Sequence, residues 1–335
     1  MSEMVKVVVD AMGGDHAPEQ TVKGAVEALQ ESEQIFVYLA GKQEAVEAEL
    51  SKYTYDKSRL EIVNTTEEIE MAEPPVNAIR TKKDSSIVRG MMMVREGKAD
   101  AFVSAGSTGA VLVGGQVLVG RLKGVERPPL APLIPTDNER GCSLLVDCGA
   151  NVDARPSNLV QFAKMGSIYM ESVMGIKNPK VGIVNIGAEE EKGNALVKET
   201  FPLLKACPDI NFVGSVEARD IPAGVVDVIV CEAFTGNVVL KTYEGVGATL
   251  IGKVKKGMMS TTRSKIGALL VKPALKETLK TFDLEQYGGA PMLGLKGLVV
   301  KTHGSSMSGE FKNSILQCLT FKQQGINEKI KEKIC

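Results

Sequence analysis

The residues best suited to chemistry stand near the start of the chain, where Asp10 ends a β-branched run and Gly13, Gly14, Asp15 and His16 follow. Glycines let the backbone approach a ligand closely and adopt conformations that a Cβ would forbid. An ordinary strand-to-helix turn is the simpler interpretation of the Gly-Gly pair taken alone. The polar residues beside the glycines favour a functional turn, and so does the repetition of the pattern downstream.

Five later apolar segments also end in small and polar residues. These turns are SAGSTGA (104–110), DCGANVD (147–153), GAEEEKGN (187–194), SVEARD (215–220) and EAFTGN (232–237). In a parallel sheet such turns all lie at the carboxyl ends of the strands, where doubly wound folds bind ligands. We therefore expect six strand ends to deliver polar residues to one crevice.

Several common kinds of site are missing from the sequence. The chain has only two histidines and no Cys cluster, which excludes a multi-histidine or zinc-finger-like metal site. It has no G-x-S-x-G elbow and no dinucleotide fingerprint after a strand. Residues 247–254 nearly match a Walker A loop, but Val254 stands where that loop needs a hydroxyl. The sequence predicts no metal and no cofactor.

The remaining groups suit an oxyanion, because glycine-rich turns that open helices present free N–H groups and a positive dipole end. Lys192, beside Gly193 and Asn194, can supply a point charge. A solvated surface lysine is the alternative interpretation. His303, which precedes Gly304 in KTHGSS, is a second candidate, and a structural histidine is equally compatible with its spacing.

The elements that must position these residues alternate along the chain. Expected strands cover residues 5–10, 35–40, 60–63, 99–104, 143–147, 181–186, 210–213, 225–231 and 298–301, with helices between most of them. Strands separated by helices predict an α/β fold, a mainly parallel sheet with helices on both faces. We expect residues 1–335 to form a single domain.

Composition limits the partners and the compartment. Hydrophobic residues make up 44% of the chain, the net charge is −1, and aromatic residues are 4% with no Trp, so nucleic-acid binding is not expected. The six cysteines form no CxxC pair and are typical of reduced thiols. No signal-like stretch precedes the first strand and no apolar run approaches membrane-spanning length, so we expect a cytoplasmic protein.

A basic amphipathic stretch lies between residues 246 and 280, with eight Lys or Arg residues against one acid, Glu277. Its apolar residues form two groups on either side of the turn at 260–262, which predicts a helical hairpin excursion over 240–282. Such helices bind anionic membrane surfaces. Packing against a partner subunit is the alternative, and the two are compatible.

Motifs in order along nearly the whole chain resemble the bacterial phosphate acyltransferase family, the acyl-carrier-protein:phosphate acyltransferases of phospholipid synthesis. The matching segments are VDAMGGDHAP (9–18), SAGSTGA (104–110), LLVDCGANVDARP (144–156), NIGAEEEKGN (185–194), GSVEARD (214–220), FTGNVVLKTYEG (234–245), YGGAPMLGLKG (287–297) and KTHGSS (301–306). Departures from the family pattern are small and remove no charged candidate: Pro129, Cys148 and Ser215 replace the family's usual residues.

The resemblance implies a three-layer α/β/α fold like that of isocitrate and isopropylmalate dehydrogenases, with a protruding hairpin. It also implies a homodimer that associates peripherally with the membrane at 246–280. The implied reaction moves a fatty acyl group from acyl-acyl carrier protein to inorganic phosphate, and a glycerol-3-phosphate acyltransferase would take the acyl-phosphate. An activated thioester and a phosphate nucleophile need mainly positioning and oxyanion stabilisation.

On this basis each candidate receives an expected role. Lys192 and Asn194 would neutralise phosphate and the oxyanion, and His16 and Asp15 would orient phosphate or assist proton transfer. The other expected binding residues are Gly13, Gly14, Gly106, Thr108, Asn151, Gly187, Gly193, Asn237, His303 and Ser305. The Lys192 turn would form the wall opposite Asp15 and His16.

Two other functions fit parts of the sequence. A nicotinamide-dependent hydroxy-acid dehydrogenase can share the fold but needs a dinucleotide site. A non-catalytic membrane-docked scaffold would rest on the basic hairpin and leaves the polar strand ends unexplained.

Overall fold

The computed structural model describes residues 4–280 and 284–334, and its described strands form two sheets. The first sheet has the order β10-β11-β4-β1-β2-β3, and all its pairs are parallel except β10 with β11. Its strands are β1 Val5–Asp10, β2 Ile35–Gly41, β3 Leu60–Asn64, β4 Ala101–Ser104, β10 Ala290–Met292 and β11 Leu298–Lys301.

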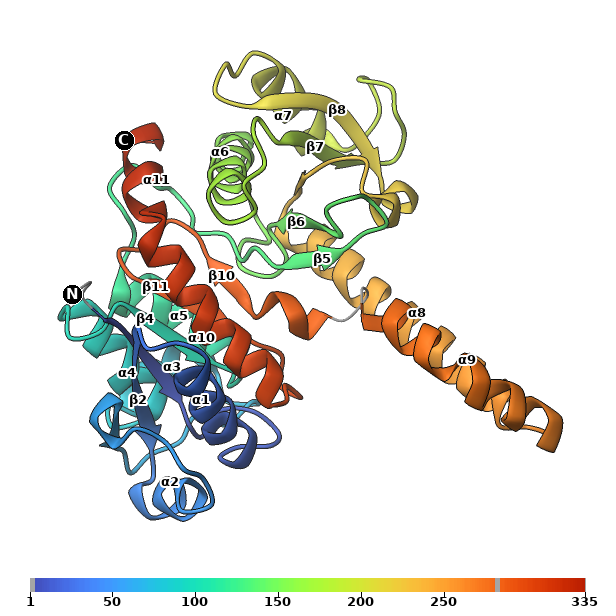
Figure 1. Cartoon of the computed structure of the whole chain (residues 1–335). Coiled ribbons are helices and arrows are strands. Elements are labelled where there is room, and N and C mark those ends of the chain that lie inside the picture. The colour runs from blue at the N-terminus through green and yellow to red at the C-terminus, as the bar shows by residue number, and fades with distance from the viewer. Residues whose placement is uncertain (1–3, 281–283, 335) are drawn as a thin grey trace.

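The second sheet has the order β5-β6-β9-β7-β8, with β5 antiparallel to β6 and the other pairs parallel. Its strands are β5 Leu133–Pro135, β6 Cys142–Val146, β7 Lys180–Asn185, β8 Asn211–Glu217 and β9 Val228–Val230. Figure 1 shows the two sheets in separate lobes of the molecule.

Helices cover both faces of the strands. They are α1 Glu19–Glu31, α2 Gln43–Leu50, α3 Pro75–Thr81, α4 Ser86–Arg95, α5 Thr108–Gly114, α6 Pro156–Val173, α7 Ala195–Lys205, α8 Ala233–Met258, α9 Thr262–Lys280, α10 Ser308–Gln323 and α11 Ile326–Ile334. Short helical turns are η1 Lys57–Arg59, η2 Gly115–Val119, η3 Ala218–Ala223 and η4 Leu284–Tyr287.

The strands are held by burial on both faces, as the β-branched runs predict. In β1 the side chains of Val7 and Val9 belong to the apolar cluster that α1 and α10 cover, and Val8 belongs to the opposite cluster beneath α4. This alternation is the two-residue period of a strand. The predicted α/β class, with a mainly parallel arrangement and helices on both faces, is confirmed.

The expectation of one sheet was wrong, because the strands divide between two. An alternating βα pattern predicts parallel pairing but does not say which strands share a sheet. The short strands β5 and β10 were also not predicted, since three-residue runs that contain proline show no periodicity. The lobes are joined through β10: Ala131 N donates to Pro291 O at 3.0 Å and Leu293 N donates to Pro129 O at 3.1 Å.

Helices α8 and α9 form the predicted hairpin, which projects away from both lobes (Figure 1). Large apolar side chains are exposed along it, with Leu269 71% and Leu270 76% accessible. Residues 281 and 282 of the expected 240–282 excursion lie outside the described residues. Within the part of the chain that the structure describes, no helix is both long enough and apolar enough to cross a membrane.

Candidate active site

A cavity of about 590 Å³ lies where strand ends of the two sheets meet. From the first sheet it receives Asp15 after β1, Thr108 after β4, and the segment 301–305 at the end of β11. From the second it receives Cys148 and Gly149 after β6 and one face of α8, the helix that follows β9. We expected six strand-end turns to line one crevice. Some of these turns, from both sheets, line the cavity, and the others do not.

The cavity is lined by both charged and apolar residues. The apolar residues include Leu130, Pro132, Leu133 and Leu240. The charged or titratable residues are Asp15, Lys241, Glu244, Lys301, His303 and Glu310. A pocket with this mixed lining suits a ligand that has both an anionic and an apolar part.

Lys241 and His303 face one another across the two lobes. Lys241 Nζ lies 3.2 Å from His303 Nε2 and 2.8 Å from Glu244 Oε2. His303 Nδ1 lies 2.8 Å from Ser305 Oγ. Burial, and then the positive charge of Lys241, lower the pKa of His303, so its neutral form is favoured at pH 7. Lys241 is thus the cation of this pair.

The wall from the second sheet is shaped by Asp147, the residue after β6. Its buried carboxylate accepts hydrogen bonds from the backbone N–H groups of Leu130, Gly149, Ala150 and Asn151 at 2.8–3.2 Å. Burial raises the pKa of this carboxyl, and the hydrogen bonds oppose that effect. Asp147 therefore holds the turn at 147–151 in a fixed shape.

Helix α8 is seated directly on this turn. A Cβ at Gly236 would lie 1.9 Å from the Asp147 carbonyl oxygen, so only glycine allows the helix to approach this closely. Asn237 Nδ2 donates to Cys148 O at 3.2 Å, and Asn237 lines the cavity. Asn151 has a structural position instead: its buried amide donates to Pro128 O at 3.0 Å and to Asp147 Oδ2 at 2.8 Å.

The opening turn after β1 is organised by Asp10. The Asp10 carboxylate is buried, accepts from Ser104 Oγ at 2.6 Å and accepts from Met12 N at 3.2 Å. A Cβ at Gly13 would lie 2.3 Å from Asp10 Oδ2, and Gly14 has φ +103°. Both glycines are therefore required by geometry.

This turn meets the C-terminal segment, because Asp15 N donates to Gly304 O at 2.7 Å. Gly13, Gly14 and Gly106 line a smaller adjoining hollow of about 220 Å³, which Asp15 shares with the larger cavity. His16 is exposed and lines neither of these two hollows.

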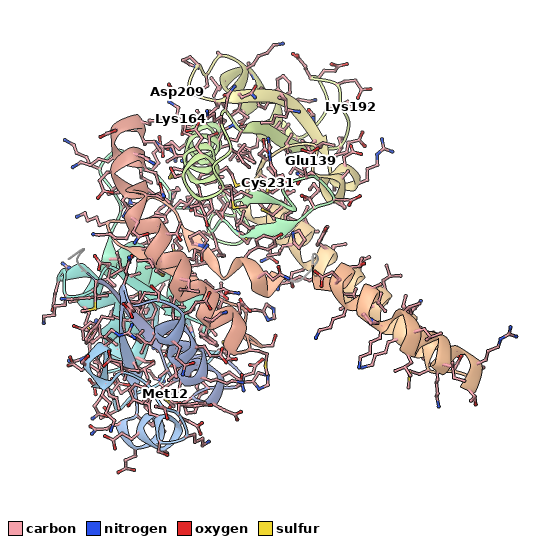
Figure 2. All side chains as sticks on the ribbon, viewed as in Figure 1. Met12, Glu139, Lys164, Lys192, Asp209 and Cys231 are labelled. Carbon is pink, nitrogen blue, oxygen red and sulfur yellow. The ribbon has the colours of Figure 1, made fainter. Side chains whose placement is uncertain are left out.

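The Lys192 turn is not the opposite wall of the cavity, which corrects the expected arrangement. It follows β7, which β9 separates from β6, so its residues lie toward the far edge of the second sheet. Figure 2 labels Lys192 on an outer loop of that lobe, and Lys192 Nζ pairs with Glu189 Oε1 at 2.7 Å. Asn194 caps α7, since its Oδ1 accepts from Val197 N at 2.9 Å.

The predicted residues therefore separate into groups by position. Those that line the larger cavity are Asp15, Thr108, Asn237, His303 and Ser305. Those that line only the smaller hollow are Gly13, Gly14 and Gly106. Those that line neither are His16, Asn151, Gly187, Lys192, Gly193 and Asn194.

Sequence reasoning missed the charged residues Lys241, Glu244 and Lys301. Lys241 and Glu244 follow Asn237 at four and seven residues, which places all three on one face of a helix. Lys301 is a charged residue at the end of an apolar strand, and the same pattern drew attention to Asp10. Among the residues that the structure describes, no group of three or more His, Cys, Asp or Glu side chains could hold a metal ion.

Comparisons with known proteins agree over almost the whole chain. A sequence family described as "Fatty acid synthesis protein" matches residues 5–329. The "Phosphate acyltransferase" of Clostridium novyi (strain NT) is 50% identical over 330 residues, which are 98% of each chain.

Two solved structures show a similar fold at low sequence identity. A phosphotransacetylase from Streptococcus pyogenes has a TM-score of 0.62 at 18% identity, covering 96% of this chain and 95% of that one. A putative 4-hydroxythreonine-4-phosphate dehydrogenase from Salmonella typhimurium has a TM-score of 0.51 at 11% identity, covering 96% and 99%. At these identities the likeness concerns the fold alone.

Proposed function

Because this chain belongs to the phosphate acyltransferase family and is an acyltransferase, we propose that it moves a fatty acyl group from acyl carrier protein to inorganic phosphate. The acyl-phosphate would enter phospholipid synthesis through a glycerol-3-phosphate acyltransferase. The observation that carries this proposal is the mixed lining of the cavity, which includes the lysines Lys241 and Lys301 together with the apolar residues Leu130, Leu133 and Leu240.

The proposed acyl transfer requires the protein to position the two reactants, and it does not require a nucleophile from the protein. Phosphate attacks the thioester carbonyl carbon, and the thiolate leaves with the electron pair of the C–S bond. Holding both reactants together and stabilising the oxyanion supplies most of the rate enhancement in such reactions. The cavity thiol, Cys148, is a poor nucleophile because burial raises its pKa well above the ordinary value.

The expected residue roles remain part of the proposal. Asp15, Thr108, Asn237, His303 and Ser305 would contact the reactants from the cavity walls. Lys192, Asn194, Gly187 and Gly193 would contribute if the loop between β7 and α7 moves toward the cavity when substrate binds. Gly13, Gly14, Gly106, His16 and Asn151 would support the turns around it.

The hairpin supports two further parts of the proposal, a homodimer and peripheral contact with an anionic membrane. Its exposed apolar residues and the basic residues around them suit either surface. We treat residues 1–335 as one functional unit, because residues of both lobes line the cavity. Location in the cytoplasm is a further part of the proposal.

The decisive experiment incubates the purified protein with long-chain acyl-acyl carrier protein and phosphate, and traps acyl-phosphate with hydroxylamine. Hydroxamate that requires phosphate, and forms faster from the carrier-protein thioester than from the matching coenzyme A thioester, supports the proposal. A coenzyme A preference would contradict the donor, and no hydroxamate would contradict the reaction. An absence of NAD binding by calorimetry would dismiss the dehydrogenase alternative.

The Lys192→Ala variant tests the role expected of that turn. We expect a loss of acyl-phosphate formation, because the proposed movement of the loop between β7 and α7 would bring Lys192 to the reactants. The circular dichroism spectrum should stay unchanged, because Lys192 is exposed and its removal disturbs only the surface pair with Glu189. Full activity in this variant would remove Lys192 from the site. The matched control is Lys205→Ala, which breaks the exposed pair with Glu190 in the same lobe.

A further inference from the structure

Lys301 is a buried lysine at the wall of the cavity. It is the last residue of β11, lies opposite Ser104 of β4 in the strand register, and is 7% exposed. Lysine is almost never fully buried without a charged partner, because removing an ammonium from water is costly. The cost of burying this ammonium must be offset by contacts of the side chain, or the buried position must serve a function.

The contacts of Lys301 do not supply that reason. An ammonium has three donors. Within residues 4–280 and 284–334, its one hydrogen-bond acceptor is the carbonyl oxygen of Thr302, and no carboxylate lies within ion-pair distance. Donors are therefore left for a ligand in the cavity that Lys301 lines.

The two acids that most favour the charged form of Lys301, Glu310 and Asp10, hydrogen-bond to other groups. Asp10 accepts from Ser104 Oγ at 2.6 Å, and Glu310 accepts from His303 N at 3.0 Å and from Ser306 Oγ at 2.6 Å. At longer range Glu310, Asp10 and Asp15 favour the charged form of Lys301, and Lys241 opposes it. Burial has the largest effect, lowering the pKa from 10.5 to about 8, so the ammonium still predominates at pH 7.

We propose that Lys301 is a catalytic residue that contacts the acceptor phosphate and the oxygen of the acyl thioester through its ammonium group. This inference rests on the proposed function. Lys241 lines the same cavity from the other lobe, so the phosphate would lie between two lysines of different lobes. The apolar lining residues Leu130, Leu133 and Leu240 would contact the acyl chain.

The step balances with the groups named. An oxygen of hydrogen phosphate forms a bond to the acyl carbon, and the C–S bond breaks with its electron pair on sulfur. The proton of hydrogen phosphate ends on the released thiol. A buried ammonium stabilises the negative charge that builds on the carbonyl oxygen, and removing one such donor typically lowers the rate by about 10²–10³-fold.

The test compares Lys301→Met with Lys296→Met in the acyl-phosphate assay. Lys296 is an exposed lysine that lies outside the cavity, just before the same strand, and serves as the matched control. We expect Lys301→Met to raise KM for phosphate and lower kcat, with kcat/KM reduced by about 100-fold or more. Lys296→Met should behave as the wild type. Ethylammonium added to Lys301→Ala should restore part of the rate, which a merely structural lysine would not allow.

Calorimetry with inorganic phosphate separates this inference from the proposed function. If the wild type turns over and Lys301→Met does so at the same rate, the inference is wrong and the function stands. If Lys301→Ala is inactive, is not rescued by ethylammonium and binds phosphate as the wild type does, the inference is also wrong. If the wild type shows no turnover, the proposed function fails, and phosphate binding that is lost in Lys301→Met but kept in Lys296→Met still supports Lys301 as an anion ligand.

Discussion

The last residues of three adjacent strands form a buried polar row, and one of them, Lys301, lines the cavity. They are Lys301 of β11, Ser104 of β4 and Asp10 of β1. All three are less than 9% exposed, and Ser104 Oγ donates to Asp10. Burial raises the pKa of Asp10 and lowers that of Lys301, so each group is pushed toward its neutral form. Titratable groups shifted by burial inside a cleft are typical of functional sites.

The pH dependence of the reaction should report the ionisation of Lys301. Since only the ammonium attracts phosphate, kcat/KM for phosphate should fall as the pH rises through about 8, the pKa of this group in the free protein. The charged groups that act on it are Glu310, Asp10, Asp15 and Lys241. The measurement is a profile of kcat/KM from pH 6.5 to 9.5.

The matched control is Lys301→Arg, because a guanidinium stays charged throughout this range. Whatever its absolute rate, this variant should show no fall near pH 8. A wild-type profile that stays level to pH 9.5, or an identical fall in Lys301→Arg, would assign the pH dependence to another group.

Helix α8 connects the chemistry to the hairpin. Its first turn is capped by Glu232, whose carboxylate accepts from Phe234 N and Thr235 N, and Tyr243 Oη donates to Pro135 O at 2.6 Å. Toward its C-terminal end the helix projects from the body of the protein (Figure 1), and an added Cβ at Gly252 would meet no neighbouring atoms. One end of this element is therefore tightly fitted and the other is open to a partner.

The tight end predicts a large effect of a single methyl group. In Gly236→Ala the new Cβ would lie 1.9 Å from the backbone oxygen of Asp147, so the helix or the turn must shift. We expect the free energy of unfolding to fall by about 1–3 kcal/mol and activity to fall with it. Urea denaturation measures the stability change.

The open end supplies the control. Gly252→Ala adds the same methyl group to the same helix, at a position where the new Cβ has no contact within 4 Å beyond the adjacent backbone of the helix itself. It should raise the free energy of unfolding by about 0.5–1 kcal/mol, because alanine loses less conformational freedom in a helix. If the two substitutions changed the free energy of unfolding equally, the contact between position 236 and the Asp147 carbonyl oxygen would not be rigid.

The hairpin tip predicts membrane binding that depends on charge and on apolar surface. We expect the protein to sediment with anionic liposomes, and less so at high salt, because each cation near the lipid contributes about 1 kcal/mol. Leu269→Glu should weaken binding, since it puts a charge on a side chain that is 71% exposed. Val213→Glu, at a half-exposed apolar position on β8, should not.

Analytical ultracentrifugation of the same variants tests the partner-subunit alternative. If Leu269→Glu leaves liposome binding unchanged and converts a dimer to a monomer, the apolar face belongs to the subunit interface. If both change, the hairpin serves both surfaces. No change in either measurement would contradict both assignments.

For the molecule as a whole, the sequence was sufficient to predict the α/β class, most strand positions, the helical hairpin and some residues of the cavity lining. Polar residues at strand ends pointed to Asp15, Thr108 and His303, which line the cavity, because that signal is local. The division of the strands into two sheets could not be predicted from the sequence, because strand pairing is determined by contacts between residues far apart in the chain. The Lys192 turn was predicted to lie at the cavity, but it follows β7, which β9 separates from β6 in the second sheet. This strand order could not be read from the sequence. Burial of Lys301 likewise follows from the packing of β10, β4 and α10 around its strand.

Both lobes contribute residues to the lining of one cavity, so a ligand there should stabilise both lobes together. Phosphate at 100 times its dissociation constant should add about 2.7 kcal/mol to the free energy of unfolding. Hydrogen exchange should slow in residues 301–306 of the first lobe and also in 233–241 at the base of α8. Chloride at equal ionic strength is the control for screening. Protection confined to residues 187–194 would instead place the phosphate at the Lys192 turn, and protection in one lobe only would show that the ligand does not bridge the cavity.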